Sequence, residues 1–157
     1  LLSDTYDKKI NYYGVTPLNN SGDKFSYYDN VDYKEIITSL FNEFKLEFNP
    51  ENNLILGDST NEEIKTKIKN LGFFDLIYID GCHDYDCVIS DIMLMKEISK
   101  NGSYIVLDDA SCFKNLSPDK FKGHIDVCQA VKDVLESDPS FVEILCVGHN
   151  RVFKRVV

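Results

Sequence analysis

Along this chain, short apolar runs alternate with longer stretches in which apolar residues recur every three or four positions. Short runs bounded by turn residues predict strands, and the periodic stretches predict amphipathic helices. The expected strands are residues 10–15, 54–56, 75–79, 104–107, 141–147 and 151–157, and the expected helices are residues 32–46, 60–71, 84–99 and 124–137. Strands and helices that alternate in this way are typical of an α/β protein with a mostly parallel sheet.

The end of the chain departs from this alternation. Residues 141–147 and 151–157 are joined only by Gly148, His149 and Asn150, which predicts an antiparallel hairpin. No internal repeat or linker divides the sequence, so we expect residues 1–157 to form a single domain. The predicted fold is a Rossmann-like open sheet with helices on both faces and a C-terminal antiparallel hairpin.

Acidic residues follow the two central strands. Asp80 comes directly after residues 75–79, and Asp108 and Asp109 come directly after residues 104–107. One helix of ordinary length separates the strands, which makes them parallel and places the three carboxylates at one edge of the sheet. Carboxylates that share a site repel one another unless protons or a cation neutralise them, and Mg²⁺ is the simplest cation with oxygen ligands. The alternative is that these aspartates are solvated residues at strand ends.

Composition narrows the range of partners. The 157-residue chain carries a formal charge of −9, which disfavours binding to a nucleic-acid backbone. Its five cysteines include no Cys-x-x-Cys pair, so we expect reduced thiols and a cytoplasmic protein rather than a disulfide framework or a zinc cage. No apolar run approaches the length of a membrane span.

Two segments carry a resemblance to a known family. Residues 75–85 read DLIYIDGCHDY, and residues 101–109 read NGSYIVLDD after the intervening helix. Together they resemble the class I S-adenosylmethionine-dependent methyltransferases, in particular the metal-dependent O-methyltransferases of the catechol and caffeoyl-coenzyme A type. The resemblance implies transfer of a methyl group from S-adenosylmethionine to a small hydroxylated acceptor, with Mg²⁺ or another divalent cation.

The resemblance also implies roles for single residues. Asp80, Asp108 and Asp109 correspond to the metal ligands, although the family's usual third ligand is Asn and Asp109 adds one negative charge. His83 stands where the catechol-type enzymes carry a basic Lys, and the resemblance implies that His83 and Asp80 are the catalytic residues. Imidazole is suited to accept a proton at neutral pH.

The implied cofactor site is less complete. Asp58 and Ser59 correspond to residues near the adenine of the cofactor. Gly14 and Thr16 correspond to the end of the strand that binds the ribose, and Asp80 is also an implied cofactor-binding residue. Thr16 replaces an acid in the family's pattern, and no Gly-x-Gly occurs anywhere in the chain. We therefore expect a protein that is truncated at its N-terminus, lacks the first strand and loop of the fold, and belongs to a longer chain.

The acceptor site and several single residues have less specific sequence signals. The acceptor is expected to contact Tyr27, Tyr28 and the loop 111–123, which is long enough to act as a lid. Packing roles are expected for Cys82 and Tyr85, and no role is predicted for His124 or His149. Rival interpretations are a methyltransferase-like binding module without catalysis, a phosphoryl-accepting receiver domain and a sugar-nucleotide-dependent transferase.

Overall fold

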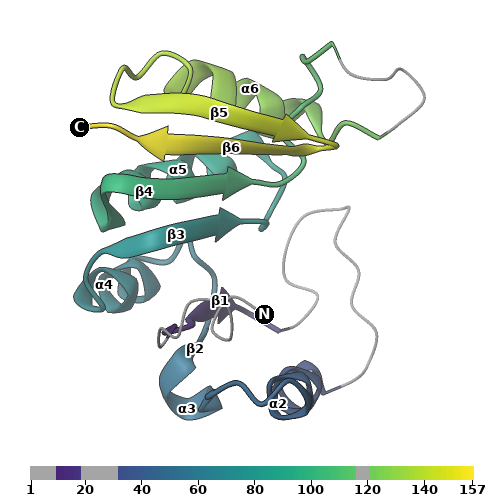
Figure 1. The fold of residues 1–157 in the computed structure, drawn as a ribbon, viewed down its shortest axis with the longest axis vertical. Coiled ribbons are helices and arrows are strands. Elements are labelled where there is room, and N and C mark those ends of the chain that lie inside the picture. The colour runs from purple at the N-terminus through teal and green to yellow at the C-terminus, as the bar shows by residue number, and fades with distance from the viewer. Residues whose placement is uncertain (1–9, 19–31, 116–120) are drawn as a thin grey trace. The chain divides into compact units, whose positions relative to one another are not determined.

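The computed structural model describes residues 10–18, 32–115 and 121–157. These form two compact units, one of residues 10–18 and 32–58 and one of residues 59–115 and 121–157, and each is described here by itself. The elements are β1 (Gly14–Thr16), α2 (Tyr33–Glu43), α3 (Pro50–Asn53), β2 (Leu54–Leu56), α4 (Glu62–Asn70), β3 (Phe74–Ile79), α5 (Tyr85–Ile98), β4 (Ser99–Leu107), α6 (Ile125–Val134), β5 (Phe141–Val147) and β6 (Asn150–Arg155) (Figure 1).

The first unit contains a small parallel sheet and two helices. Strands β1 and β2 pair in parallel, with Gly14 opposite Leu54 and Thr16 opposite Leu56. Helix α2 begins after Asp32, whose side chain accepts a hydrogen bond from the Glu35 N–H, as expected for an N-cap.

Aromatic side chains pack inside this first unit. The Phe41 ring stacks on Phe48 with 4.2 Å between centroids and meets Tyr12 edge-on at 5.5 Å. No residue of α2 is buried in the described structure, so this aromatic cluster, rather than a helix face, supplies the apolar contacts of α2.

The second unit is built on a four-stranded sheet of order β3-β4-β6-β5. Strands β3 and β4 are parallel, whereas β6 runs antiparallel to both β4 and β5, which confirms the predicted crossover and hairpin. The mixed sheet with its closing hairpin confirms the expected fold class.

Helices α5 and α6 cover one face of this sheet (Figure 1). The core lies between them and consists of residues from both helices and from the inward-facing strand positions, among them Ile92, Met95, Ile105, Val131 and Phe153. Each of these is at most 1% exposed, so the sheet and the helices that position its carboxyl edge are held by a close-packed apolar layer.

Several boundaries differ from the sequence prediction. The first strand covers Gly14–Thr16 rather than residues 10–15. Helix α4 begins later than the predicted residue 60, because its N-cap is Asn61, whose side chain accepts from two backbone N–H groups. Leu71, at the end of the predicted helix, is its C-cap and is 40% exposed. Strand β4 begins at Ser99 rather than at residue 104, with a register shift opposite β3.

Some expectations concern residues outside the described part of the chain. The predicted contacts of Tyr27 and Tyr28 belong to this group, as does the middle of the loop 111–123. In the part of the chain that the structure does describe, every helix is too short or too polar to cross a bilayer.

Candidate functional site

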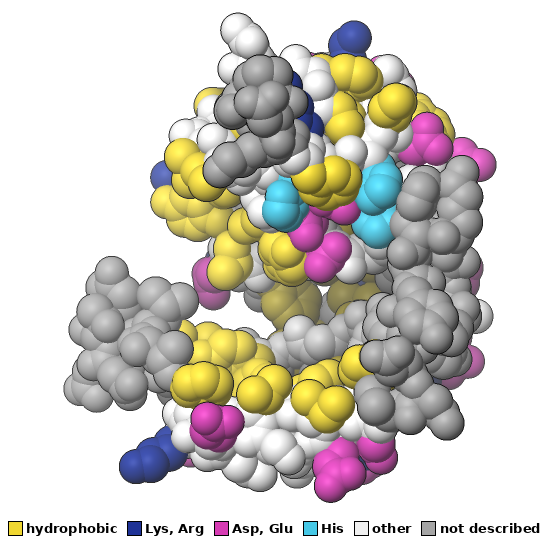
Figure 2. All heavy atoms as spheres, turned by 90° about the vertical axis from the view of Figure 1, so that its right-hand side faces the viewer, with side chains coloured by type: hydrophobic (Ala, Val, Ile, Leu, Met, Phe, Trp, Pro, Cys, Tyr) yellow, Lys and Arg dark blue, Asp and Glu magenta, His cyan; other side chains and the backbone are white. Residues whose placement is uncertain are grey.

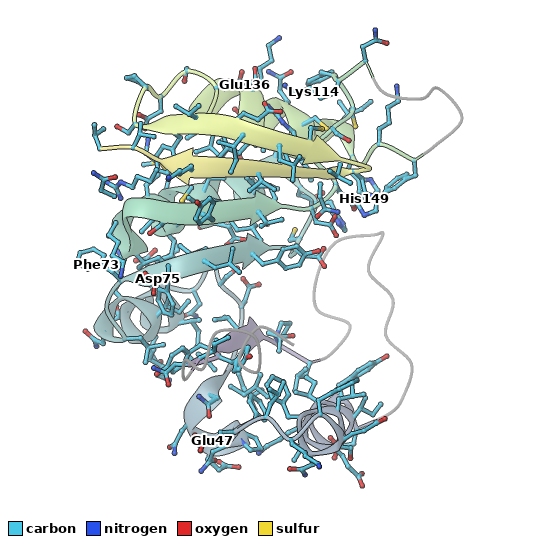
Figure 3. All side chains as sticks on the ribbon, in the orientation of Figure 1. Glu47, Phe73, Asp75, Lys114, Glu136 and His149 are labelled. Carbon is cyan, nitrogen blue, oxygen red and sulfur yellow. The ribbon has the colours of Figure 1, made fainter. Side chains whose placement is uncertain are left out.

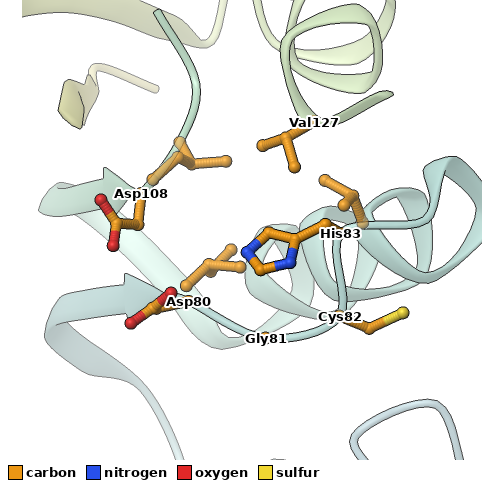
Figure 4. A pocket seen from close by; sticks show the side chains of 9 residues that line it. Asp80, Gly81, Cys82, His83, Asp108 and Val127 are labelled. Carbon is orange, nitrogen blue, oxygen red and sulfur yellow. The ribbon is translucent and has the colours of Figure 1, made fainter. Parts of the chain in front are cut away.

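The register of β3 and β4 brings two of the predicted acids together. Ile79 lies opposite Leu107 at the ends of the two strands, and the Asp108 N–H donates to the Ile79 carbonyl at 3.0 Å. Asp80 and Asp108 are the next residues along each strand, so they leave the sheet side by side. Figure 4 shows both carboxylates on the same side of the strand ends, with the His83 ring pointing toward them. The predicted convergence of Asp80 and Asp108 at one edge is therefore confirmed.

The electrostatics of this pair are unfavourable for two negative charges. Burial raises the pKa of the Asp80 carboxyl above its usual value, and the negative charges of Asp108 and Asp109 raise it further, while His83 lowers it. The Tyr78 hydroxyl donates to Asp108 Oδ2 at 3.0 Å. Burial, followed by this hydrogen bond, raises the pKa of Tyr78 as well. Both shifts indicate a site with excess negative charge.

Asp109 points to a different set of partners because of its backbone. Its φ of 51° lies in the left-handed region, where Asp is tolerated better than most residues. Its carboxylate Oδ2 lies 3.2 Å from His83 Nε2 and 3.5 Å from His124 Nε2. Asp109 is only 9% exposed, so the two imidazoles surround a largely buried carboxylate.

A short backbone pairing holds this arrangement. Ala110 forms an antiparallel bridge with Gly123, and the His124 N–H donates to the Asp109 carbonyl at 3.0 Å. At Gly123, where φ is +105°, a Cβ atom would lie 1.9 Å from the Asp109 carbonyl oxygen. Glycine is therefore required for the chain to pass this close to Asp109.

The hairpin turn supplies a third imidazole. His149 Nε2 lies 3.1 Å from Asp108 Oδ1, at the opposite end of the sheet from Phe73 and Asp75 (Figure 3). The Ala110 N–H donates to the His149 carbonyl at 2.8 Å, and the buried Ser111 hydroxyl donates to the Gly148 carbonyl at 2.7 Å. These bonds tie the turn before β6 to the end of β4. In Figure 2, histidine side chains lie on both sides of acidic side chains on this surface.

Two sets of three side chains among the described residues bring ligand atoms within 4.8 Å of one another. They are His83, Asp109 and His124, and Asp108, Asp109 and His149. Asp80 belongs to neither set, although it lies beside Asp108. The predicted ligand set of Asp80, Asp108 and Asp109 therefore stays a prediction, with Asp108 and Asp109 also presented to imidazoles.

The donor groups at this edge suit a divalent cation. Asp80 and Asp108 offer carboxylate oxygens, the ligands that Mg²⁺ takes in proteins, and burial, together with the neighbouring carboxylates, raises the pKa of Asp80. The pocket behind them is lined by Asp80, His83 and Asp108 and by apolar side chains of Val88 and Val127. A small ligand would meet a polar rim and an apolar floor.

Sequence reasoning missed His124 and His149. Both are distant in sequence from Asp80, but the order of strands and helices indicates where each must lie. A helix that follows β4 begins at its carboxyl edge, and a strand antiparallel to β4 begins at the same edge. The start of α6 and the turn before β6 therefore had to lie near Asp108 and Asp109.

The predicted cofactor residues lie in the first unit, apart from Ser59 and Asp80. Thr16 ends β1 and its carbonyl accepts from the Gly57 N–H at 3.0 Å, so Thr16 and the Gly57–Asp58 segment lie at one edge of the small sheet. The Thr16 hydroxyl oxygen accepts from the Leu18 N–H at 3.2 Å. Gly14 faces Leu54, whose Cδ1 would lie 3.1 Å from a Cβ at this position. Packing against Leu54 therefore favours glycine here, independently of any role in cofactor binding.

Comparison with known proteins agrees with this fold. The profile of a family described as a methyltransferase domain matches residues 15–110, more than half of the chain. No curated protein matches the chain in sequence.

Solved structures of similar fold include three of particular interest. CalS11, a TDP-rhamnose 3′-O-methyltransferase of calicheamicin biosynthesis in its apo form, is 13% identical, with a TM-score of 0.62, over 98% of this chain and 63% of its own. An O-methyltransferase from Bacillus cereus in complex with SAH is 14% identical, with a TM-score of 0.54, over 99% of this chain and 77% of its own. MycE of mycinamycin biosynthesis, in complex with Mg and SAH, is 14% identical, with a TM-score of 0.50, over 98% of this chain and 48% of its own.

Identities this low establish a likeness of fold, and this chain spans 63% of the length of CalS11. The sequence resemblance to class I methyltransferases is confirmed by the family profile and by these folds together. The chain belongs to this methyltransferase domain family and has the class I methyltransferase fold.

Proposed function

We propose that this protein is an S-adenosylmethionine-dependent O-methyltransferase that uses a divalent metal ion and acts on a small hydroxylated acceptor. The observation that carries the proposal is the meeting of Asp80 and Asp108 at adjacent strand ends beside His83, in a chain that belongs to a methyltransferase family. The receiver-domain and sugar-nucleotide interpretations have no comparable support.

The carboxylates would hold the metal ion. Asp80, Asp108 and Asp109 provide oxygen ligands, and a bound Mg²⁺ or similar cation would supply the positive charge that lowers the pKa of an acceptor hydroxyl. A bound cation would offset the repulsion between these carboxylates, which adds to burial in raising the pKa of Asp80. Tyr78, through its hydrogen bond to Asp108, fixes the orientation of one ligand.

His83 is positioned to accept the proton that the acceptor loses. Its ring lines the pocket beside both acids, and Asp109 Oδ2 lies 3.2 Å from its Nε2. A carboxylate at this distance stabilises the imidazolium that forms when His83 takes up a proton. S-adenosylmethionine, when bound, supplies the methyl group, and this chain's task is to hold the acceptor oxygen in line with it.

The cofactor would contact the edge of the β1–β2 sheet. Thr16 and Asp58 lie at that edge, and Asp58 can accept a hydrogen bond from an adenine amino group. Gly14, Ser59 and Asp80 complete the proposed set on the strength of the family resemblance.

Two features support the choice of acceptor and compartment. CalS11 is named for methylation of a rhamnose hydroxyl, and MycE binds Mg together with SAH, so sugar hydroxyls join catechols as the first acceptors to test. All five cysteines are free thiols, which agrees with a cytoplasmic location.

A methyl-transfer assay tests the proposal. The full-length protein is incubated with radiolabelled S-adenosylmethionine, Mg²⁺ and a panel of catechols and deoxysugar nucleotides, with and without EDTA. We expect label in at least one acceptor, a loss of at least about 100-fold with EDTA, and a similar loss in Asp108→Asn. Transfer that is unaffected by EDTA would contradict the role of the metal.

The second candidate is a methyltransferase-like binding module without catalysis. It is favoured by Thr16, which replaces an acid and whose hydroxyl is engaged by the Leu18 N–H. Calorimetry with S-adenosylmethionine discriminates between the two. A protein that binds no S-adenosylmethionine, and transfers no label to any acceptor, would establish the module.

A further inference from the structure

Two histidines converge on one buried carboxylate beside the proposed Mg²⁺ site. His83 Nε2 and His124 Nε2 lie 3.2 and 3.5 Å from the same oxygen, Asp109 Oδ2. The two imidazole rings are 4.3 Å apart between centroids and tilted by 40°. The three side chains thus bring one ligand atom each within 4.8 Å of one another. We refer to them as the His–Asp–His triad.

The spacing of this triad matches a coordination shell. Zinc binds imidazole nitrogen and carboxylate oxygen at about 2.0–2.1 Å, so two ligands of a tetrahedral ion lie about 3.3–3.4 Å apart. The observed separations of 3.2 and 3.5 Å bracket this value, and all three ligand atoms lie within 4.8 Å of one another. An ion would fit with only small movements of the side chains.

The triad is held by the backbone. His83 stands in the segment between β3 and α5, and His124 is the N-cap of α6, with its N–H bound to the Asp109 carbonyl. The Cys128 thiol contacts the same carbonyl at 3.5 Å. The Phe121 ring packs edge-on against His124 at 5.5 Å. The ligands are therefore placed before any ion arrives, which reduces the entropic cost of binding.

The chemistry of the triad differs from that of the carboxylate pair. Two imidazoles and one carboxylate suit zinc and the divalent ions of cobalt, nickel and iron, whereas Mg²⁺ prefers a shell of oxygens. Side-chain exposures of 16% for His83, 12% for Asp109 and 22% for His124 leave a path to solvent, so a water or an acceptor oxygen can occupy the fourth position.

We propose that His83, Asp109 and His124 form a binding site for a transition-metal ion of the zinc type, which shares Asp109 with the proposed Mg²⁺ ligands and uses two imidazoles in place of Asp80 and Asp108. The site itself does not depend on methyl transfer. One consequence does rest on the proposed function. An ion bound to His83 Nε2 takes the place of the Asp109 contact that stabilises the imidazolium and disfavours protonation of the ring, so zinc or cobalt at this site would inhibit transfer while Mg²⁺ supports it.

Cobalt provides the test, because tetrahedral Co²⁺ absorbs visible light far more strongly than the hydrated ion. The full-length protein is titrated with Co²⁺ alone, followed by competition with Zn²⁺ and with excess Mg²⁺. We expect a tetrahedral spectrum in the wild type that Zn²⁺ abolishes and that Mg²⁺ displaces only at far higher concentration, because Mg²⁺ prefers oxygen ligands and shares only Asp109 with the triad. His124→Ala should weaken Co²⁺ binding by at least about 100-fold, because it removes a direct ligand.

Two matched variants locate the ion. His149→Ala removes an imidazole that contacts Asp108 rather than the triad, and Asp80→Asn removes a carboxylate that the triad does not use. Both should retain Co²⁺ affinity within about twofold. Circular dichroism checks the fold of each variant, and His83→Gln replaces His124→Ala if the latter does not fold.

The opposite pattern overturns the proposal. If His149→Ala or Asp80→Asn abolishes the tetrahedral spectrum while His124→Ala and His83→Gln keep it, the ion sits on the acidic edge and the triad is a set of hydrogen bonds. A wild-type protein that shows no tetrahedral spectrum contradicts the site as well. The Mg²⁺ site of the proposed function is judged separately, because Asp80→Asn should impair Mg²⁺ binding without affecting Co²⁺.

Discussion

Two clusters of charged side chains in the second unit differ in how their carboxylates are neutralised. In the arginine cluster, Arg151 is 1% exposed and bonds to Glu136 at 2.6 Å and to Glu143, which also receives Lys114 at 2.8 Å. Two cations thus meet two carboxylates. Figure 3 shows Glu136 and Lys114 beside β5, the edge strand of the sheet that lies farthest from β3.

The acidic edge of Asp80, Asp108 and Asp109 is not balanced in this way. The ion-pair partners that the described residues offer Asp108 and Asp109 are imidazoles, whose charge depends on protonation. The pKa of Glu143 is lowered by its hydrogen bonds to Arg151 and Lys114 despite its burial, whereas the pKa of Asp80 is raised by burial and by neighbouring acids.

The comparison separates structural charge from binding charge. A cluster that contains its own counterions is complete without a ligand, and this one joins the segment after α6 to the hairpin. A cluster that lacks them is less stable alone and gains from a cation. Three pairs of variants test this distinction by the change that each causes in the free energy of unfolding, in order of decreasing effect.

The largest effect is expected at Arg151. Arg151→Ala leaves Glu136 and Glu143 without their buried partner, and removing one member of a buried ion pair costs about 3 kcal/mol of unfolding free energy. Urea denaturation measures the loss. Lys154→Ala, on the same strand with its ammonium over the Tyr104 ring at 5.5 Å, should cost less than about 1 kcal/mol. Equal losses of unfolding free energy in the two variants would show that the arginine cluster contributes no more to stability than the contact of Lys154 with Tyr104.

A second effect concerns the turn that supports the acidic edge. Gly123→Ala places a Cβ atom 1.9 Å from the Asp109 carbonyl oxygen, so the bridge to Ala110 must open, at a cost of at least about 2 kcal/mol. Gly102→Ala is the control, because φ is +92° there but nothing lies within 4 Å, and backbone strain alone should cost about 1 kcal/mol. If the control loses as much stability as Gly123→Ala, the contact with Asp109 is not what requires glycine.

The smallest effect has the opposite sign. The raised pKa of Asp80 means that the folded protein holds a proton there more tightly than the unfolded chain does. The contribution of this group to stability is therefore greatest below the unfolded pKa of about 3.9, and it is lost as the pH rises through the folded pKa. Asp80→Asn removes that loss. Because Asp80 is partly exposed, the gain near pH 7 should be less than about 1 kcal/mol.

Denaturation at several pH values between 4 and 8, without divalent ions, measures this gain. Glu143→Gln serves as the comparison from the arginine cluster and should destabilise the protein at neutral pH, because it removes a carboxylate that lies between two cations. Destabilisation by Asp80→Asn at pH 7 would contradict the view that the acidic edge is short of positive charge.

Much of this architecture was predictable from the sequence, because local signals agreed with the fold. Helix α5 and strands β3 and β4 follow from their periodicity, and the parallel crossover placed Asp80 beside Asp108. Strand β1 was harder, since residues 10–15 have strand-like composition but pair with β2 only from Gly14.

The rest of the site depends on features that sequence patterns do not carry. The left-handed backbone of Asp109 turns its carboxylate toward His83 and His124. That geometry is set by the close approach of Gly123, a tertiary contact. His149 reaches Asp108 only because β6 pairs with β4 rather than with β3.

Calorimetry with Mg²⁺ is the most direct test of a metal site at the ends of β3 and β4, and it compares the wild type with Asp108→Ala and Asp133→Ala. Asp133 is the control because it lies on α6 and accepts a hydrogen bond from Tyr85. The account predicts that the wild type and Asp133→Ala bind Mg²⁺ with similar affinity and that Asp108→Ala shows no measurable binding. Binding in Asp108→Ala that equals the wild type, or no binding in the wild type, would contradict a metal site at the ends of β3 and β4.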